Sequence, residues 1–162
     1  MVADLAKQER ISSSMLTKIE LIATIQNNPE TYTLYFFQKK DKVILPIKLP
    51  SSEIENLFQV SKEYKNSIPT VYDTFKRLIG CLEAALASIT IYRFEQDIYY
   101  TYLNVNKDGN FLEINSGFTD AIAIAEKCNV PVFIDKNLLH KNGIKITNKL
   151  LKEALGQAYQ IS

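Results

Sequence analysis

The sequence predicts an α+β fold, with a single domain in which helices pack against a mixed, mostly antiparallel sheet. The 162 residues are enough for one domain with an ordinary core. The predicted elements run as three strands, two helices, three strands, and then a helix, a strand and a helix, so strands and helices form separate runs. The chain also lacks the GxGxxG and GxxxxGK loops of nucleotide-binding folds with regular β–α alternation.

The composition limits the function classes. Lysine and arginine number 19 against 18 aspartates and glutamates, a net charge of +1. This excludes a uniformly basic nucleic-acid binder but leaves a local basic patch open. Two cysteines and one histidine are too few for a disulfide framework or a Cys/His zinc site. No apolar run has the length of a signal peptide or a membrane span, so we expect a cytoplasmic protein.

The first three elements are predicted strands. Alternation of apolar and polar residues predicts a strand over residues 18–26, and Asn27-Asn28-Pro29 predicts the turn that follows. Two β-rich runs at residues 32–37 and 43–49 flank the charged residues 38–42, a pattern typical of a hairpin.

The next two elements are predicted helices. A capping box of Ser52 and Glu55, with apolar residues at helical spacing behind it, predicts a helix that ends before residues 66–69. A second, longer helix is predicted from Thr70, with an apolar stripe that runs as far as Leu86.

The rest of the chain predicts three strands followed by an alternation of helices and a strand. Three strands are predicted over residues 88–94, 98–105 and 110–114, and the Asp108-Gly109 pair is a strong hairpin signal. The C-terminal part predicts a helix over 119–128, a strand over 131–134, a helical turn over 135–140 and an amphipathic helix over 147–159.

Three stretches of the chain together carry a family pattern. They are Val43-Ile44-Leu45-Pro46-Ile47-Lys48-Leu49 leading into a helix with an early glutamate, Ile68-Pro69-Thr70-Val71-Tyr72-Asp73, and Asn115-Ser116-Gly117-Phe118-Thr119-Asp120-Ala121-Ile122-Ala123-Ile124-Ala125. In this order the chain resembles the bifunctional nuclease domain, a family named for members with both DNase and RNase activity. The resemblance covers residues 42–146. We expect a domain of this kind over 17–146, with a lead-in at 1–16 and a C-terminal helix at 147–162.

The resemblance implies a nuclease that uses a divalent metal, Mg²⁺ or Mn²⁺. Glu53, Asp73 and Asp120 match family carboxylates and are the implied metal ligands and catalytic residues, and Tyr72 joins them where the family has a histidine. Clustered carboxylates suit this chemistry, because hard cations prefer oxygen ligands and can activate a water for attack on phosphorus.

Each of these residues also has a structural interpretation. The three acids lie near predicted helix starts, where the helix dipole favours a carboxylate by about 0.3–1 kcal/mol. Thr70 and Asp73 fit a Thr-x-x-Asp cap, and Thr119 is a natural N-cap with Asp120 in its first turn. Tyr72 is either a hydrogen-bond donor or a packed aromatic, since an ordinary tyrosine pKa of about 10 makes a poor base at neutral pH.

Two further groups of residues suggest contacts with single- or double-stranded DNA or RNA. Lys145, Lys149 and Lys152 would share one helical face, either against phosphates or as a solvated surface. The tyrosines at 92, 99, 100 and 102 would form either a base-stacking platform or a set of cross-strand packing contacts.

Two functions remain open at this point. The first is a divergent metal-dependent nuclease with a partly eroded site, since the family's two arginines fall on Ile68 and Gly117 and one of its aspartates falls on Asn115. The alternative is a non-catalytic interaction or regulatory module on the same fold. The resemblance also implies a homo-oligomer, most simply a dimer, and residues 32–37 would need covering if they form a sheet edge.

Overall fold

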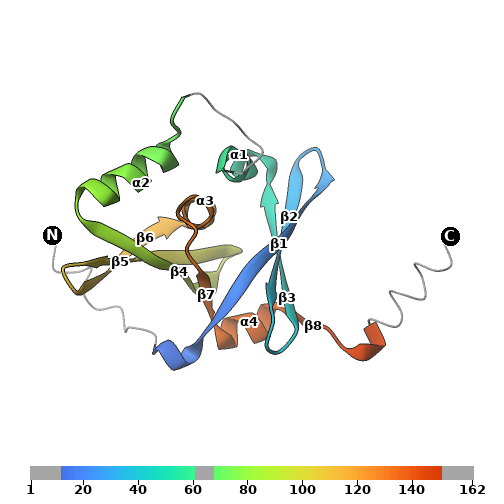
Figure 1. Ribbon diagram of the computed structural model, residues 1–162. Helices are drawn as coiled ribbons and strands as arrows, with labels where there is room; N and C mark the ends of the chain where they lie inside the picture. The colour runs from blue at the N-terminus through green and yellow to red at the C-terminus, as the bar shows by residue number, and fades with distance from the viewer. Residues whose placement is uncertain (1–11, 61–67, 151–162) are drawn as a thin grey trace.

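In the residues that the computed structural model describes, 12–60 and 68–150, eight strands form one sheet in the order β6-β5-β4-β7-β1-β2-β3-β8 (Figure 1). β4 and β7 pair in parallel, and the other neighbours pair antiparallel. The predicted α+β class with a mixed sheet is therefore confirmed. After a short 3₁₀ turn at Ser13–Met15, the elements are β1 (Leu16–Asn28), β2 (Thr31–Gln38), β3 (Val43–Pro50), α1 (Ser51–Val60), α2 (Val71–Cys81), β4 (Ala84–Glu95), β5 (Ile98–Lys107), β6 (Asn110–Gly117), α3 (Phe118–Cys128), β7 (Val132–Asp135), α4 (Lys136–Asn142) and β8 (Ile144–Lys145).

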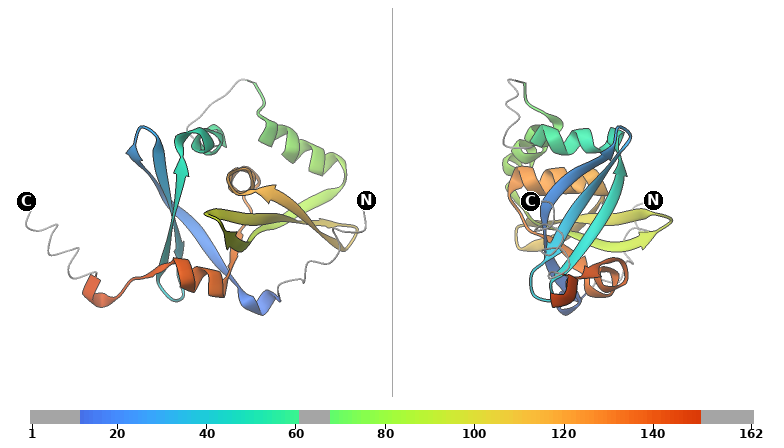
Figure 2. Two further views of the ribbon diagram at one scale, coloured as in Figure 1. Left: turned by 180° about the vertical axis from the view of Figure 1, so that it is seen from behind. Right: turned by 90° about the vertical axis from the view of Figure 1, so that its right-hand side faces the viewer.

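β1 joins two halves of this sheet. Its residues 16–19 pair with β7, and its residues 20–28 pair with β2. Figure 1 shows β2 and β3 rising steeply while β4 and β5 run across the view, so the two halves are strongly rotated against each other. The views in Figure 2 show the same crossing, with α3 lying in the angle between the halves.

α3 is the central helix of the core. Its buried residues are Phe118, Thr119 and the run from Ala121 to Ala125. The small alanines let the helix approach β4 and β5 on one side and α1 and α2 on the other. The helix is therefore covered on both sides, unlike a surface helix with one apolar face. This packing fixes the position of the first turn of α3, where the candidate site lies.

Turn chemistry at the two hairpins matches the predicted turns. Gln96 and Asp97 have φ of 51° and 62° between β4 and β5, and Asp108 and Gly109 have φ of 53° and 77° between β5 and β6. Two consecutive positive φ values define the type I′ turn that joins twisted strands. The seven predicted strands are confirmed as β1 to β7, while the two-residue strand β8 is missing from the prediction.

The predicted end of the second helix is wrong. α2 ends at Cys81, and Glu83 takes a left-handed conformation with φ of 54° that turns the chain into β4. Leu86 therefore lies in β4 opposite Val105, and Leu82 is 54% exposed rather than part of a buried stripe. Pairing with β5 outweighs the helical periodicity, because local propensity is a weak prior against tertiary contacts.

Two predicted helix caps are also wrong. α1 begins at Ser51, so Ser52 lies inside the helix and is not its cap. α3 begins at Phe118, and its N-cap is Gly117, which makes no side-chain cap hydrogen bond. Thr119 is therefore the second residue of the helix, and its hydroxyl is available for another contact. The capping box predicted from Thr70 and Asp73 is confirmed at the start of α2.

Residues 32–37 do not form a sheet edge. β2 lies between β1 and β3, so residues 32–37 pair on both sides. Among the described strands, β6 and β8 are the two edges of the sheet, and residues 20–28 of β1 also pair on one side only, because the pairing with β7 ends at Ile19. The dimer stays a prediction. No helix in the described residues is both long and apolar enough to cross a membrane.

Candidate functional site

A cleft of about 570 Å³ opens between the two halves of the sheet. One wall comes from residues 47–50 at the end of β3 and from Glu53 and Asn56 of α1. The other comes from residues 97–100 at the start of β5 and from residues 116–120, where β6 runs into α3. The first turns of two helices thus face the same space.

The three predicted acids occupy the same position in their helices. Glu53 is the third residue of α1, Asp73 of α2 and Asp120 of α3. A carboxylate in the first turn of a helix is stabilised by the helix dipole in each case. Their surroundings nevertheless differ, because Glu53 and Asp120 line the cleft and Asp73 does not.

Asp120 is held by residues from two other helices. Its Oδ1 accepts hydrogen bonds from the hydroxyl of Tyr72 at 2.8 Å and from the side-chain amide of Asn56 at 3.3 Å. Its Oδ2 lies 3.6 Å from the point that a Cβ on Gly117 would occupy. Among the described residues no hydrogen bond ends on Oδ2, so this oxygen is available at the wall of the cleft.

Glu53 is linked to the same turn of α3. Its Oε2 accepts a hydrogen bond from the hydroxyl of Thr119 at 3.0 Å. Asn56 lies one helical turn after Glu53, so both side chains project from one face of α1 toward α3. The contacts from Glu53 to Thr119 and from Asn56 to Asp120 therefore hold α1 close to the first turn of α3.

Tyr72 is a donor and not a base in this arrangement. Only 4% of the residue is exposed. Burial, together with the hydrogen bond and negative charge of Asp120, raises the pKa of the Tyr72 hydroxyl well above its usual value. The phenol therefore stays protonated and donates to Asp120 across the neutral pH range. A histidine at this position would titrate near neutral pH, and Tyr72 does not.

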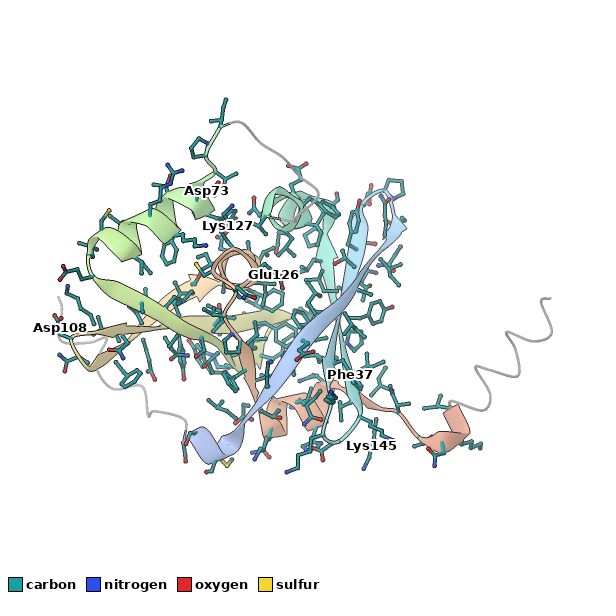
Figure 3. All side chains as sticks on the ribbon, in the orientation of Figure 1. Phe37, Asp73, Asp108, Glu126, Lys127 and Lys145 are labelled. Carbon is teal, nitrogen blue, oxygen red and sulfur yellow. The ribbon has the colours of Figure 1, made fainter. Side chains whose placement is uncertain are left out.

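Both carboxylate oxygens of Asp73 have partners, one at the start of its own helix and one in α3. Oδ2 accepts from the backbone N–H of Thr70 at 2.8 Å and from its hydroxyl at 2.9 Å. Oδ1 pairs with the ammonium of Lys127 at 2.5 Å, and Figure 3 shows the two side chains between α2 and α3. Lys127, and then the hydrogen bonds from Thr70, lower the pKa of Asp73 to about 2. These contacts match the capping interpretation of Asp73.

The three predicted metal ligands are not brought together. Within residues 12–60 and 68–150, no three His, Cys, Asp or Glu side chains are grouped so that they could hold a metal ion. Asp97, which the prediction lacks, lines the cleft with Glu53 and Asp120, and oxygen donors of this kind suit Mg²⁺ or Mn²⁺ in type. In their present positions, however, the residues do not fit the ion, and Mg²⁺ or Mn²⁺ stays a prediction.

The predicted lysine face is wrong in part. Lys145 lies in β8, Lys149 lies in the helical residues 148–150, and Lys152 is outside the described residues. β8 pairs with the start of β3 at Val43 and Ile44, whereas the cleft lies at the other end of that strand. At about 3.4 Å per residue the two places are roughly 15–20 Å apart along β3. Phosphate contacts by these lysines stay a prediction.

Cross-strand packing of the tyrosines is confirmed. The ring of Tyr92 lies 5.0 Å from that of Tyr102 and 6.3 Å from that of Tyr100, measured between centroids. Tyr99 points to the other face of the sheet and packs on Phe118 of α3 with centroids 5.6 Å apart. His140 lies in the last turn of α4.

Sequence reasoning missed three residues of the cleft. Asn56 could have been found from its spacing, since it follows Glu53 by one helical turn and is a natural partner for a carboxylate. Thr119 is predicted as a cap, and Asp97 lies in the turn between β4 and β5. Their position at the cleft depends on tertiary packing that no local pattern contains.

Comparisons with known proteins agree with the resemblance. The family model of the bifunctional nuclease domain matches residues 35–147, which include all of α1, α2 and α3. The protein named Bifunctional nuclease 1 from Oryza sativa subsp. indica and the one named Bifunctional nuclease from Oryza minuta are each 22% identical to the chain over 180 residues. Each match covers 93% of this chain and 54% of the relative. The chain thus spans about half the length of the curated relatives it matches.

Proposed function

The chain belongs to the bifunctional nuclease domain family, and from this premise we propose that it binds DNA or RNA in the cleft and cleaves phosphodiester bonds there. The cleft is the region where elements far apart in the sequence bring polar side chains together inside the matched segment. The activity, the substrate and any larger assembly of this chain are all part of this proposal.

One observation carries the proposal. Tyr72 of α2, Asn56 of α1 and Asp120 of α3 form a connected set of hydrogen bonds at the wall of the cleft. A carboxylate that served only as a helix cap would bond to its own helix start, as Asp73 does. Asp120 is instead positioned by two other helices with one oxygen left over, which is the arrangement expected of a group that acts on a ligand.

The chemistry that these residues can perform is limited and specific. The first turn of α3 presents backbone N–H groups and the positive end of the helix dipole to the cleft, which suits a phosphate oxygen. Asp120 Oδ2 can orient an attacking water and accept its proton, while Tyr72 holds the other oxygen in place. Tyr72 cannot take that proton itself, because its pKa is raised and its hydroxyl already donates to Asp120.

Charge in the cleft makes added cations an important variable. Glu53, Asp97 and Asp120 have the same sign of charge as a phosphodiester, and Lys48 is the one basic residue among the described lining residues. The dipole of α3 offsets part of this repulsion. The described carboxylates are not grouped so that they could hold an ion, so we assign no step to a bound metal. Mg²⁺, Mn²⁺ and a chelator are therefore conditions of the assay.

The test is cleavage of labelled single-stranded DNA, duplex DNA and RNA, each with Mg²⁺, with Mn²⁺ and with chelator. The matched pair of variants is Asp120→Asn and Asp73→Asn, purified in the same way as wild type so that a contaminating nuclease would appear in all three. We expect cleavage by wild type and by Asp73→Asn, and loss of cleavage in Asp120→Asn. Cleavage that is equal in all three proteins would overturn the role of Asp120.

A second function is favoured by the residue at position 72. A buried phenol that stays protonated cannot exchange protons as a histidine can, which suits a cleft that binds without reacting. The alternative is therefore a non-catalytic interaction or regulatory module. Binding of nucleic acid that Asp120→Asn leaves intact, with no cleavage by wild type under any metal condition, would favour this module over the nuclease.

A further inference from the structure

A second groove continues from the cleft past the start of α3. Its volume is about 540 Å³, and its walls come from β4, β5 and β6. Tyr100, Ser116 and Gly117 line both the groove and the cleft, so the two spaces meet at these residues. A ligand chain with one phosphate at the first turn of α3 would therefore extend into the groove.

The groove is built on a row of residues that runs across three strands. Arg93 of β4 pairs with Tyr100 of β5, which in turn pairs with Gly117 of β6. The guanidinium carbon of Arg93 lies 4.0 Å from the centre of the Tyr100 ring, a close cation–π contact. The hydroxyl of Thr101 donates to the carbonyl of Ser116 at 2.7 Å and ties β5 to β6 at the base of the groove.

A bulge in β4 places two neighbouring side chains on this one face. The register between β4 and β5 shifts between Ile91 and Arg93, so Tyr92 has no single partner. In a regular strand Tyr92 and Arg93 would point to opposite faces. Here the ring of Tyr92 lies 6.3 Å from that of Tyr100, and Arg93 lies over the same ring. Bulges commonly redirect side chains in this way beside functional sites.

The charge of the groove differs from that of the cleft. No carboxylate is among the described residues that line it, and Arg93 is its cation. Arg93 also pairs with Glu95 at 3.6 Å, but the two side chains are 50% and 58% exposed. Ion pairs between exposed side chains contribute little to stability. The sequence has three arginines, and among the described residues Arg93 is the one that lines this groove.

We propose that this groove, defined by Tyr92, Arg93, Tyr100 and Asn115, binds one nucleotide of single-stranded nucleic acid next to the phosphate held in the cleft. The base stacks on the Arg93–Tyr100 pair, and the guanidinium faces the adjoining phosphate. A duplex is disfavoured, because a base that stacks on a side chain must first leave its partner strand. The side-chain amide of Asn115 can bond to a base edge at the rim. This inference rests on the proposed function, since it takes the cleft as the phosphate site.

The experiment measures binding of a fluorescent oligothymidylate single strand by anisotropy, in parallel with a duplex of the same length. The variants are Tyr100→Leu, which keeps an apolar side chain without a ring, Tyr100→Phe, which keeps the ring, and Arg93→Gln. Tyr35→Leu is the matched control, because Tyr35 is also half-buried on a strand but lies in β2, away from both spaces. Thermal unfolding of each variant shows whether it is folded.

We expect Tyr100→Leu to weaken single-strand binding roughly ten-fold, from the usual strength of base–aromatic stacking. Tyr100→Phe and Tyr35→Leu should bind as wild type does, and Arg93→Gln should bind more weakly and with a smaller dependence on salt. Duplex binding should change little in Tyr100→Leu. Single-strand binding by a folded Tyr100→Leu that equals wild type would overturn the proposal.

The assay separates this inference from the proposed function. If single-strand binding depends on Tyr100 but wild type cleaves nothing, the groove is supported as a nucleotide site and the nuclease function is overturned. Cleavage that depends on Asp120, with binding and KM indifferent to Tyr100 and Arg93, would keep the nuclease and remove the groove. Absence of any single-strand binding by wild type at low salt would overturn the groove as a nucleic-acid site.

Discussion

In α2 and in α3 an aspartate is the third residue of the helix, and the residue three positions before it is the N-cap. In α2 the cap is Thr70, and its backbone N–H and hydroxyl both bond to Asp73. In α3 the cap is Gly117, which has no side chain, and Asp120 bonds instead to Tyr72 and Asn56 from other helices. Asp73 is bonded to its own helix start and to Lys127, whereas Asp120 is presented to a cleft.

The difference lies in the N-cap and in the neighbouring helix. A threonine cap offers the aspartate a reciprocal pair of hydrogen bonds, and Lys127 then neutralises the charge that remains. A glycine cap has a backbone N–H but no hydroxyl, so it cannot form this reciprocal pair, and the orientation of Asp120 is decided by what packs beside it. A first-turn acid is thus informative about function only when its cap is known.

The largest expected effect is on cleavage by Asp120→Asn. An asparagine keeps the size of the side chain and can still accept from Tyr72, but it can no longer take a proton from water. We expect the rate of cleavage to fall about 100-fold or more, the usual range for loss of a general base, while the thermal unfolding midpoint changes little. A comparable fall in Asp73→Asn would remove the contrast between the two helices.

The second effect is on stability, and it belongs to α2. Thr70→Ala removes the hydroxyl that bonds to Asp73 and should lower the free energy of unfolding by about 1 kcal/mol. Cleavage should stay at the wild-type level. Chemical denaturation measures the change, and Thr74→Ala, an exposed position on the same helix, is the control. If Thr70→Ala cost no more than Thr74→Ala, the capping box would not be what holds this helix start.

The third effect is a pH dependence of the stability that comes from Asp73. Lys127 and Thr70 lower its pKa from 3.8 to about 2, so the folded state favours the charged carboxylate. The stability from this group is complete above pH 3.8 and is lost as the pH falls toward 2. We expect wild type to be more stable than Asp73→Asn at neutral pH, with the difference shrinking over that window. Acid denaturation of both proteins tests this, and a difference that stayed constant down to pH 2 would contradict it.

The same contrast separates what a sequence can predict from what it cannot. The capping box of Thr70 and Asp73 and the Asp108-Gly109 turn were predictable, because each depends on residues within a few positions of one another. The bond from Tyr72 to Asp120 spans 48 residues and depends on how α2 crosses α3. Equally, the end of α2 at Cys81 follows from the pairing of β4 with β5, which outweighs a helical pattern in the same residues. Local chemistry was therefore predictable, and the choice between a capping acid and a cleft acid was not.

The smallest expected effect comes from making α3 resemble α2 by Gly117→Ser. Gly117 has φ of −62° and ψ of 146°, which any residue adopts, and a Cβ there would make an ordinary contact with Asp120 Oδ2 at 3.6 Å. The new hydroxyl would complete a capping box and draw Asp120 toward its own helix start. We expect the free energy of unfolding to rise by a few tenths of a kcal/mol, and cleavage to fall several-fold because the free oxygen becomes engaged.

Gly80→Ser is the control for this change. Gly80 lies in α2 with nothing within 4 Å of the position of a Cβ, so serine there should alter helix propensity alone. Its stability should rise by a similar small amount while cleavage stays at the wild-type level. If Gly117→Ser gained stability and cleaved as wild type does, capping and presentation to the cleft would not compete for Asp120. The absence of a side chain at Gly117 would then not be what separates α3 from α2.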